Sequence, residues 1–151
     1  MNEEMKNTEG GYDCLLLKNQ LCFPLYAASR EILRKYTPHL RELDLTYTQY
    51  IVMMALWEKK SLTVGELGEL LFLDTGTLSP LLKAMEKKGL LCRTRDTNDE
   101  RIVKIAITKD GEALKEKAAK VPAKMGGCIN LSEDEAKSLY AILYKILGKS
   151  F

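Results

Sequence analysis

Residues 74–108 constrain the fold of this chain more than any other stretch, because they specify one helix followed by two short strands. Asp74 can accept hydrogen bonds from the first free N–H groups of a helix, and Gly89 suits the left-handed residue just past a helix end. Apolar residues recur between them at the spacing of one helix face: Leu78, Leu81, Leu82 and Met85. We therefore predict a helix over residues 74–88 with this face against a core.

The opposite face of the same predicted helix is polar. Small hydroxyl groups lie toward its N-terminal end and a lysine follows them: Thr75, Thr77, Ser79 and Lys83. Such a helix can enter the major groove of DNA, where its side chains reach base edges and phosphates.

Two short β-type runs, residues 90–95 and 101–107, follow the helix and predict a two-stranded wing around the polar turn 96–100. Between residues 83 and 104 the chain has seven basic and four acidic side chains, whereas the whole chain has a net charge of only +2. Arg93, Arg95 and Arg101 belong to this basic cluster. A solvated face of an ordinary α+β domain is the alternative, but helix, wing and charge together favour DNA binding.

Two further helices precede this stretch, and each begins with the residues of a capping box. Thr46 with Gln49 starts a helix over residues 46–59, and Thr63 with Glu66 starts a shorter one over residues 63–71. The shorter helix and the helix after Asp74 then form a helix-turn-helix, of which the second helix is the reader.

A long helix is predicted near the N-terminus, over residues 14–40, and it contains Cys22 and Pro24. Pro24 either kinks this helix or marks its first turn, and the second alternative would put Cys22 at a helix N-terminus. The positive end of a helix stabilises a thiolate and makes it reactive toward oxidants. The alternative is that Cys22 is a small buried apolar residue.

Tyr36 follows Cys22 by fourteen positions on the same side of this helix, which is roughly 21 Å at ~1.5 Å per residue. The two side chains therefore cannot touch within one chain. In an antiparallel or crossed dimer, Tyr36 of one subunit could meet Cys22 of the other.

After the wing, Thr108 and Ser132 are predicted to cap two C-terminal helices, the last of which has an apolar face. The predicted fold class is mainly α with a small β-wing: a winged helix-turn-helix flanked by N- and C-terminal dimerisation helices. The 151 residues then form a single domain, with dimerisation helices at about 14–45 and 108–151 and a DNA-binding lobe at about 46–107.

The composition excludes several other classes of protein. The chain has no apolar run long enough for a membrane span, and its acidic opening lacks the features of a signal peptide, so we expect a cytoplasmic protein without membrane contact. The four cysteines form no C-x-x-C pair and the single histidine has no thiol pattern near it, so we expect no metal site and no cofactor.

Four segments together resemble the MarR-family winged-helix regulators, in particular the branch that senses organic hydroperoxides. The segments are LKNQLCFPLYAASREILRKY, LTYTQYIVMMALWE, LTVGELGELLFLDTGTLSPLLKAMEKKGL and DERIVKIAIT. The resemblance extends over residues 17–108 and is most specific around the cysteine in NQLCF. It implies a homodimeric transcriptional repressor, not an enzyme, that binds a palindromic double-stranded operator when reduced and releases it when oxidised by an organic hydroperoxide.

The resemblance also implies roles for individual residues. Cys22 matches the redox sensor that passes through a sulfenic acid. Tyr36 and Tyr47 match tyrosines that reach across the dimer to hydrogen-bond its sulfur, and Phe23 and Tyr26 lie in the sensor pocket. In the wing, Arg101 matches an arginine inserted in the minor groove and Asp99 the acid that braces it. Pro24 departs from the family pattern.

Two outcomes of oxidation remain open at this point. Cys22 could condense with a low-molecular-weight thiol, or with a second cysteine near the partner's C-terminal helices, for which Cys128 is the candidate. The alternative to a resolving role is that Cys128 is incidental. Cys92 is expected to be structural, and Cys14 has no assignment.

Three rival functions remain open as well. The chain could be a MarR-type repressor released by a small aromatic ligand, in which case Cys22 is only a packing residue. It could be a thiol-dependent peroxidase, although no basic or histidine partner accompanies Cys22 in the sequence. It could also use a winged helix for protein contacts alone.

Overall fold

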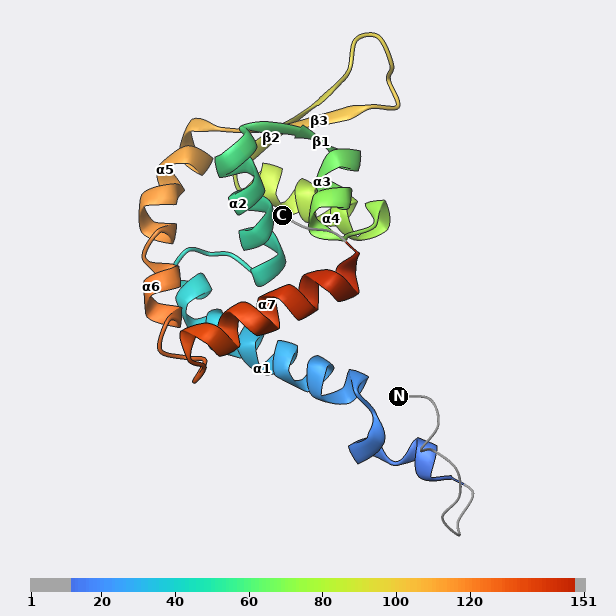
Figure 1. The fold of residues 1–151 in the computed structure, drawn as a ribbon. Coiled ribbons are helices and arrows are strands. Elements are labelled where there is room, and N and C mark those ends of the chain that lie inside the picture. Colours follow the sequence, from blue (N-terminus) through green and yellow to red (C-terminus); the bar gives the residue numbers. More distant parts are fainter. Residues whose placement is uncertain (1–11, 149–151) are drawn as a thin grey trace.

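The computed structural model describes residues 12–148, which form seven α-helices and one small antiparallel sheet (Figure 1). The helices are α1 (Cys22–Arg41), α2 (Tyr47–Lys59), α3 (Val64–Leu71), α4 (Thr75–Lys87), α5 (Lys109–Ala118), α6 (Val121–Met125) and α7 (Glu133–Leu147). The strands are β1 (Ser61–Thr63), β2 (Leu91–Arg95) and β3 (Val103–Ile107). The acidic opening of the chain, on which the expectation of a cytoplasmic protein partly depends, lies almost wholly outside the described residues.

The first helix begins later than predicted. Residues 13–15 and 17–19 form single 3₁₀ turns, separated by extended backbone at Leu16, so the prediction of a continuous helix from residue 14 is wrong. Pro24 is the third residue of α1, where its missing N–H needs no partner within the helix. Of the two alternatives for Pro24, the first-turn position is confirmed, and Cys22 is the first residue of the helix.

The predicted helix starts are confirmed by their caps. Thr46 and Thr63 each form a complete capping box, with Gln49 and Glu66 respectively, and the carboxylate of Asp74 accepts a hydrogen bond from the N–H of Thr77. Thr108 and Ser132 cap α5 and α7 in the same way. Past α4, Gly89 has a φ of +74°, a conformation that a glycine adopts without strain.

The sheet has three strands where two were predicted. Its order is β1-β3-β2, and β1 pairs antiparallel with β3 from Ser61 opposite Ala106 to Thr63 opposite Lys104. A three-residue strand is too short to show the alternation by which strands are recognised in a sequence. Strand β3 also begins at Val103 rather than at residue 101, because the N–H of Ile102 turns back to the carbonyl of Asp99.

The core lies where α2, α3, α4 and the sheet meet. The predicted apolar face of α4 is part of it, since Leu78, Leu82 and Met85 are almost fully buried. Close backbone approaches around this core require glycine at two positions. A Cβ on Gly68 would lie 2.7 Å from the carbonyl oxygen of Leu73 in the turn before α4, and one on Gly111 would lie 2.1 Å from that of Leu90.

Helices α1 and α7, which flank the lobe, contribute few buried residues to the core. Helix α7 contains no buried residue, and the only buried residue of α1 is Leu40, near its C-terminal end. The N-terminal half of α1 projects away from the rest of the chain, at the end opposite the wing (Figure 1). Within residues 12–148, no helix combines the length and apolar character needed to cross a membrane.

Candidate functional site

The polar face of α4 is exposed as predicted, with its hydroxyl groups near the helix start. The hydroxyl of Thr77 donates to Asp74 over 2.9 Å, and that of Ser79 donates to the carbonyl of Thr75 over 2.8 Å. Bonds from the Thr77 backbone and hydroxyl lower the pKa of Asp74 below its ordinary value of 3.8. Thr75, Thr77 and Lys83 are exposed and Ser79 is half-buried, so these residues form a polar surface of fixed geometry.

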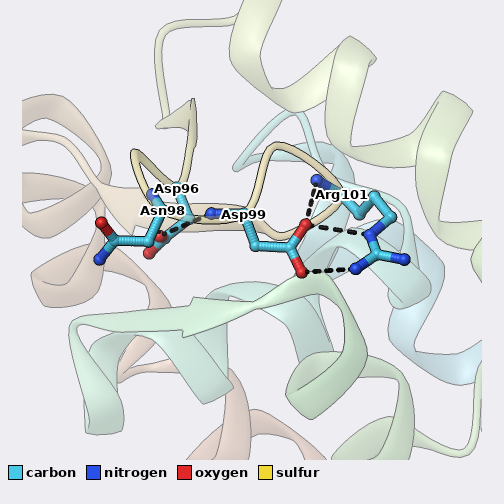
Figure 2. Close-up of polar contacts among 4 residues, drawn as sticks. All are labelled: Asp96, Asn98, Asp99 and Arg101. Atoms are coloured by element: carbon cyan, nitrogen blue, oxygen red, sulfur yellow. Dashed lines mark hydrogen bonds and ion pairs between the residues drawn. The ribbon is translucent and has the colours of Figure 1, made fainter.

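The tip of the wing presents Arg101, held by Asp99 (Figure 2). The Arg101 guanidinium donates to both Asp99 oxygens, over 3.1 and 3.2 Å, and the Arg101 backbone N–H donates to the same carboxylate over 3.0 Å. These bonds lower the pKa of Asp99 below its ordinary value of 3.8. The Arg101 side chain nevertheless remains 91% exposed, so it is oriented by its neighbour and still available to an outside anion.

The stem of the wing is fixed by two further ion pairs. The Arg93 guanidinium lies 2.7 Å from the carboxylate of Glu86 on α4, and Lys104 lies 2.6 Å from Asp96. Arg93 thus joins β2 to the reading helix, and a contact between Arg93 and DNA stays a prediction. Arg95, at the end of β2, is exposed.

A pocket of about 390 Å³ lies between the start of α3, the polar face of α4 and the wing. It brings together residues that are far apart in the sequence, including Thr75, Ser79, Arg93 and Arg101. Helix α4 and the wing therefore border one hollow, which combines apolar side chains such as Leu82 and Val103 with two arginines whose charge suits an anion.

The predicted sensor end of the molecule lies on the first turns of α1. Cys22 is exposed at the helix start, and no side chain caps that start. Phe23 is 42% and Tyr26 56% exposed, so residues 12–148 cover these apolar side chains near the thiol only in part. The Tyr26 hydroxyl accepts a hydrogen bond of 2.9 Å from Arg30, which also lies over the ring.

Tyr36 and Tyr47 lie together at the junction of α1 and α2. Their ring centroids are 5.1 Å apart with an edge-on geometry, and Tyr50 lies 6.2 Å from Tyr36. Burial, reinforced by Tyr36, raises the pKa of Tyr47 above its ordinary value of 10.0, so at neutral pH this phenol keeps its proton and can donate a hydrogen bond.

Cys128, half-buried after α6, lies against α1. The ammonium of Lys35 donates to the backbone carbonyl of Cys128 over 2.6 Å, and the thiol lies 3.6 Å from the carbonyl of Lys124. Lys35 directly precedes Tyr36 in α1, so Cys128 contacts this helix one residue before Tyr36. Sequence reasoning missed Lys35, since a contact across ninety-three residues leaves no local pattern.

Comparisons with known proteins agree with this arrangement. Residues 34–118 match the family model of the SarA/Rot transcriptional regulators. The chain is 48% identical to the organic hydroperoxide resistance transcriptional regulator of Bacillus subtilis, over 92% of this chain and 95% of that one. It is 46% identical to the regulator SarZ of Staphylococcus aureus, over 89% of this chain and 91% of that one.

Among solved structures, reduced AbfR bound to DNA superposes with a TM-score of 0.76 at 32% identity, covering 91% of this chain and 96% of that one. AbfR is from Staphylococcus epidermidis. Its disulfide-formed structure matches less well, with a TM-score of 0.63 at 31% identity over 90% of this chain and 96% of that one. The matching proteins are regulators rather than enzymes. With its helix-turn-helix, its wing and these relatives, the chain belongs to the MarR-type winged-helix transcriptional regulators, in the SarA/Rot family and similar to the organic hydroperoxide regulators.

Proposed function

We propose that this chain is a redox-sensing repressor that acts as a homodimer, binds a palindromic operator while Cys22 is reduced, and releases it when an organic hydroperoxide oxidises Cys22. The observation that carries the proposal is the 48% identity, over 92% of the chain, to a regulator of organic hydroperoxide resistance. A repressor of this kind acts on DNA in the cytoplasm.

The chemistry assigned to Cys22 requires a thiolate and an apolar site. The thiolate attacks the terminal oxygen of the hydroperoxide, the O–O bond breaks, and the products are a sulfenic acid and an alkoxide that takes a proton from water. Cys22 is exposed at the first residue of α1, whose start no side chain caps, so a hydroperoxide can reach the thiol. Phe23 and Tyr26 would form an apolar pocket for the organic group once a second subunit covers them.

Tyr36 and Tyr47 supply the link between the thiol and the DNA-binding lobe. In the proposed dimer their hydroxyls donate to the Cys22 sulfur of the other subunit. Tyr47 keeps its proton, and it is the first residue of α2, the helix on which the core of the lobe is built. Loss of these bonds on oxidation would therefore act directly on the position of α2.

Cys128 is the proposed resolving cysteine. Its thiol attacks the sulfenic sulfur of the partner's Cys22, a disulfide forms and water leaves. The bond from Lys35 keeps Cys128 near Tyr36, the residue that is proposed to meet the same sulfur. AbfR, solved in a disulfide-formed state, is a relative with such chemistry. Condensation with a low-molecular-weight thiol is the competing outcome.

The DNA contacts are assigned to α4 and the wing. Thr75, Thr77, Ser79 and Lys83 would enter the major groove, and Arg101, oriented by Asp99, the adjacent minor groove. Arg93 and Arg95 would support the backbone contacts. Residues 14–45 and 108–151 would form the dimerisation helices that set the two lobes one turn of DNA apart, ~34 Å.

Release is proposed to follow from a rotation of the two lobes. The fold described here matches reduced, DNA-bound AbfR with a TM-score of 0.76 and the disulfide form with only 0.63. Overoxidised AbfR bound to DNA matches with a TM-score of 0.74, so the lower score of the disulfide form supports the view that a disulfide favours another arrangement.

A second candidate function is favoured by the pocket of about 390 Å³ between α4 and the wing. A small aromatic acid bound beside Arg93 and Arg101 would release DNA without any change at Cys22. Ligand-induced release that survives Cys22→Ser would support this alternative.

Fluorescence anisotropy on the upstream DNA of the protein's own gene tests the proposal. The reduced wild type should bind tightly and lose binding after an equimolar amount of cumene hydroperoxide, and a thiol reductant should restore it. Cys22→Ser should bind equally well and ignore the peroxide, while Cys92→Ser should behave as the wild type. If Cys22→Ser is still released by the peroxide, the assignment of the sensor is wrong.

A further inference from the structure

Lys88 is the C-cap residue of the reading helix α4, and its side chain turns back toward the junction of α1 and α2. Its ammonium lies 3.1 Å from a carboxylate oxygen of Asp44, donates to the Asp44 carbonyl, and lies 3.4 Å from the side-chain oxygen of Gln49. In the sequence Lys88 belongs to the basic cluster and looks like one of several phosphate contacts. In the structure only 31% of its side chain is exposed.

Gln49 makes this contact more than a surface ion pair. Its side chain is 7% exposed, and the oxygen that faces Lys88 also accepts the N–H of Thr46 over 3.1 Å. One amide oxygen thus serves both the cap of α2 and the end of α4. The Asp44 carboxylate is 88% exposed and adds little, because water screens such a pair.

The contacts of Lys88 with Asp44 and Gln49 lie beside Tyr47, so they can respond to a movement of this tyrosine. Tyr47 directly follows Thr46, so the helix turn that Gln49 caps is the turn that holds Tyr47. A shift of Tyr47 moves that turn, and with it the acceptor to which Lys88 is bound. The end of α4 and Tyr47 are therefore connected through the side chains of Lys88 and Gln49 and the backbone of Thr46.

We propose that Lys88 is a positioning residue that couples the state of the sensor thiol to the orientation of the reading helix. This inference rests on the proposed function and adds a regulatory residue to it. With the thiol reduced, Lys88 fixes the C-terminal end of α4 against the first turn of α2. When Tyr47 loses its partner, the altered cap of α2 moves the end of α4.

Two substitutions separate this role from that of a plain positive charge. Lys88→Met keeps the length of the side chain and removes its ammonium. Lys87→Met removes the same charge from the neighbouring, exposed position of α4. Lys88→Arg retains a donor and should rescue the coupling in part.

The first readout is hydrogen exchange of the amides of Gln49 and Tyr50 in the reduced, DNA-free protein, since both bond to Thr46. We expect exchange to become several-fold faster in Lys88→Met and to stay unchanged in Lys87→Met. Equal exchange in the two variants would overturn the inference, because the contact would then have no effect on the cap.

The second readout is the ratio of operator Kd between the peroxide-treated and the reduced protein, with sulfenic acid formation followed by dimedone labelling. Labelling should be the same in all variants, and the ratio should fall at least tenfold in Lys88→Met only. A responsive wild type with an unchanged ratio in Lys88→Met overturns the coupling alone. A wild type whose binding ignores the peroxide overturns the proposed function, and the coupling with it.

Discussion

The DNA-binding lobe and the flanking helices differ in how much of their apolar surface is buried within one chain. The lobe, from α2 to β3, has its own core, capped helices and an oriented arginine at the wing. The first half of α1 and all of α7 contain no buried residue, although Ser132 caps α7: Phe23 is 42%, Tyr140 55% and Ile146 60% exposed. The lobe thus has a complete core within one chain, whereas the apolar faces of the first half of α1 and of α7 stay exposed, as on surfaces that bind another protein.

This difference explains where a redox signal can act. A thiol inside the finished core would be inaccessible to a hydroperoxide, and a thiol on an isolated exposed helix would have nothing to move. Under the proposed function, Cys22 at the exposed start of α1 becomes part of a complete site when the partner subunit supplies Tyr36 and Tyr47. These tyrosines join the flanking helices to the lobe, since Tyr36 of α1 packs on Tyr47, the first residue of α2.

The largest expected effect comes from placing negative charges on the apolar face of α7, where they would repel one another across the proposed dimer interface. Leu139→Glu with Ile146→Glu should prevent dimerisation and weaken operator binding by about 100-fold or more, because two linked half-sites become independent. Sedimentation should give a monomer whose far-UV circular dichroism shows a folded lobe. Lys137→Glu, on the same helix, is the control and should remain dimeric. A double variant that stays dimeric would remove α7 from the interface.

Within the lobe, Arg101→Ala should weaken operator binding by about 10- to 100-fold in the reduced protein. The reason is that a guanidinium already oriented by Asp99 is lost from the wing. Asp99→Asn should have a smaller effect in the same direction, since the arginine remains but loses its brace. Anisotropy titrations measure both, and unchanged affinity in Arg101→Ala would place the wing outside the DNA contact.

A stability effect should follow from Trp57→Phe, the only tryptophan of the chain. Its indole N–H donates to the carbonyl of Gly111 over 2.9 Å and thereby joins α2 to α5. Losing this buried hydrogen bond and part of the indole's packing should together cost about 1–3 kcal/mol of unfolding free energy. Urea denaturation followed by circular dichroism measures it. Met54→Leu, at an exposed position of the same helix, should change little, and equal values for both would contradict the assignment.

The smallest expected effect is that of Thr46→Ala, which removes one half of the capping box of α2. We expect a loss of ~1 kcal/mol in unfolding free energy, with Thr46→Ser close to the wild type. Because this cap holds the turn of Tyr47, the oxidised-to-reduced ratio of operator Kd should also change. An effect on stability without any effect on this ratio would separate the cap from the switch.

Local patterns predicted most of the lobe. Caps, a glycine past a helix and apolar spacing identified α2, α3, α4 and the wing, because such signals act over a few residues. The same reasoning failed at residues 14–21, where apolar and basic residues resembled a helix but the chain forms separate turns. It also missed β1, which is a strand only because β3 lies beside it.

In the candidate site, too, local contacts differ from those that join distant segments of the chain. The Asp99–Arg101 pair, which lies within one turn, was implied by the resemblance to a family, and the structure shows the bond. The contacts of Lys35 with Cys128, of Lys88 with Gln49 and of Trp57 with Gly111 could not be predicted, because each joins segments that only the tertiary fold brings together. The resemblance to a family supplied roles for Cys22, Tyr36 and Tyr47, which spacing alone left open.

A mixed dimer tests most directly the central claim that each sensor site is built from two chains. One protomer carries Cys128→Ser and keeps Cys22, while its partner carries Cys22→Ser and keeps Tyr36, Tyr47 and Cys128; two affinity tags isolate the pair. After an equimolar amount of cumene hydroperoxide, non-reducing electrophoresis should show a covalent dimer, and operator binding should be lost. The reverse pair, a wild-type protomer with a partner lacking both cysteines, should form no covalent dimer. A disulfide within the wild-type protomer of that reverse pair, with no crosslink in the first, would contradict the account.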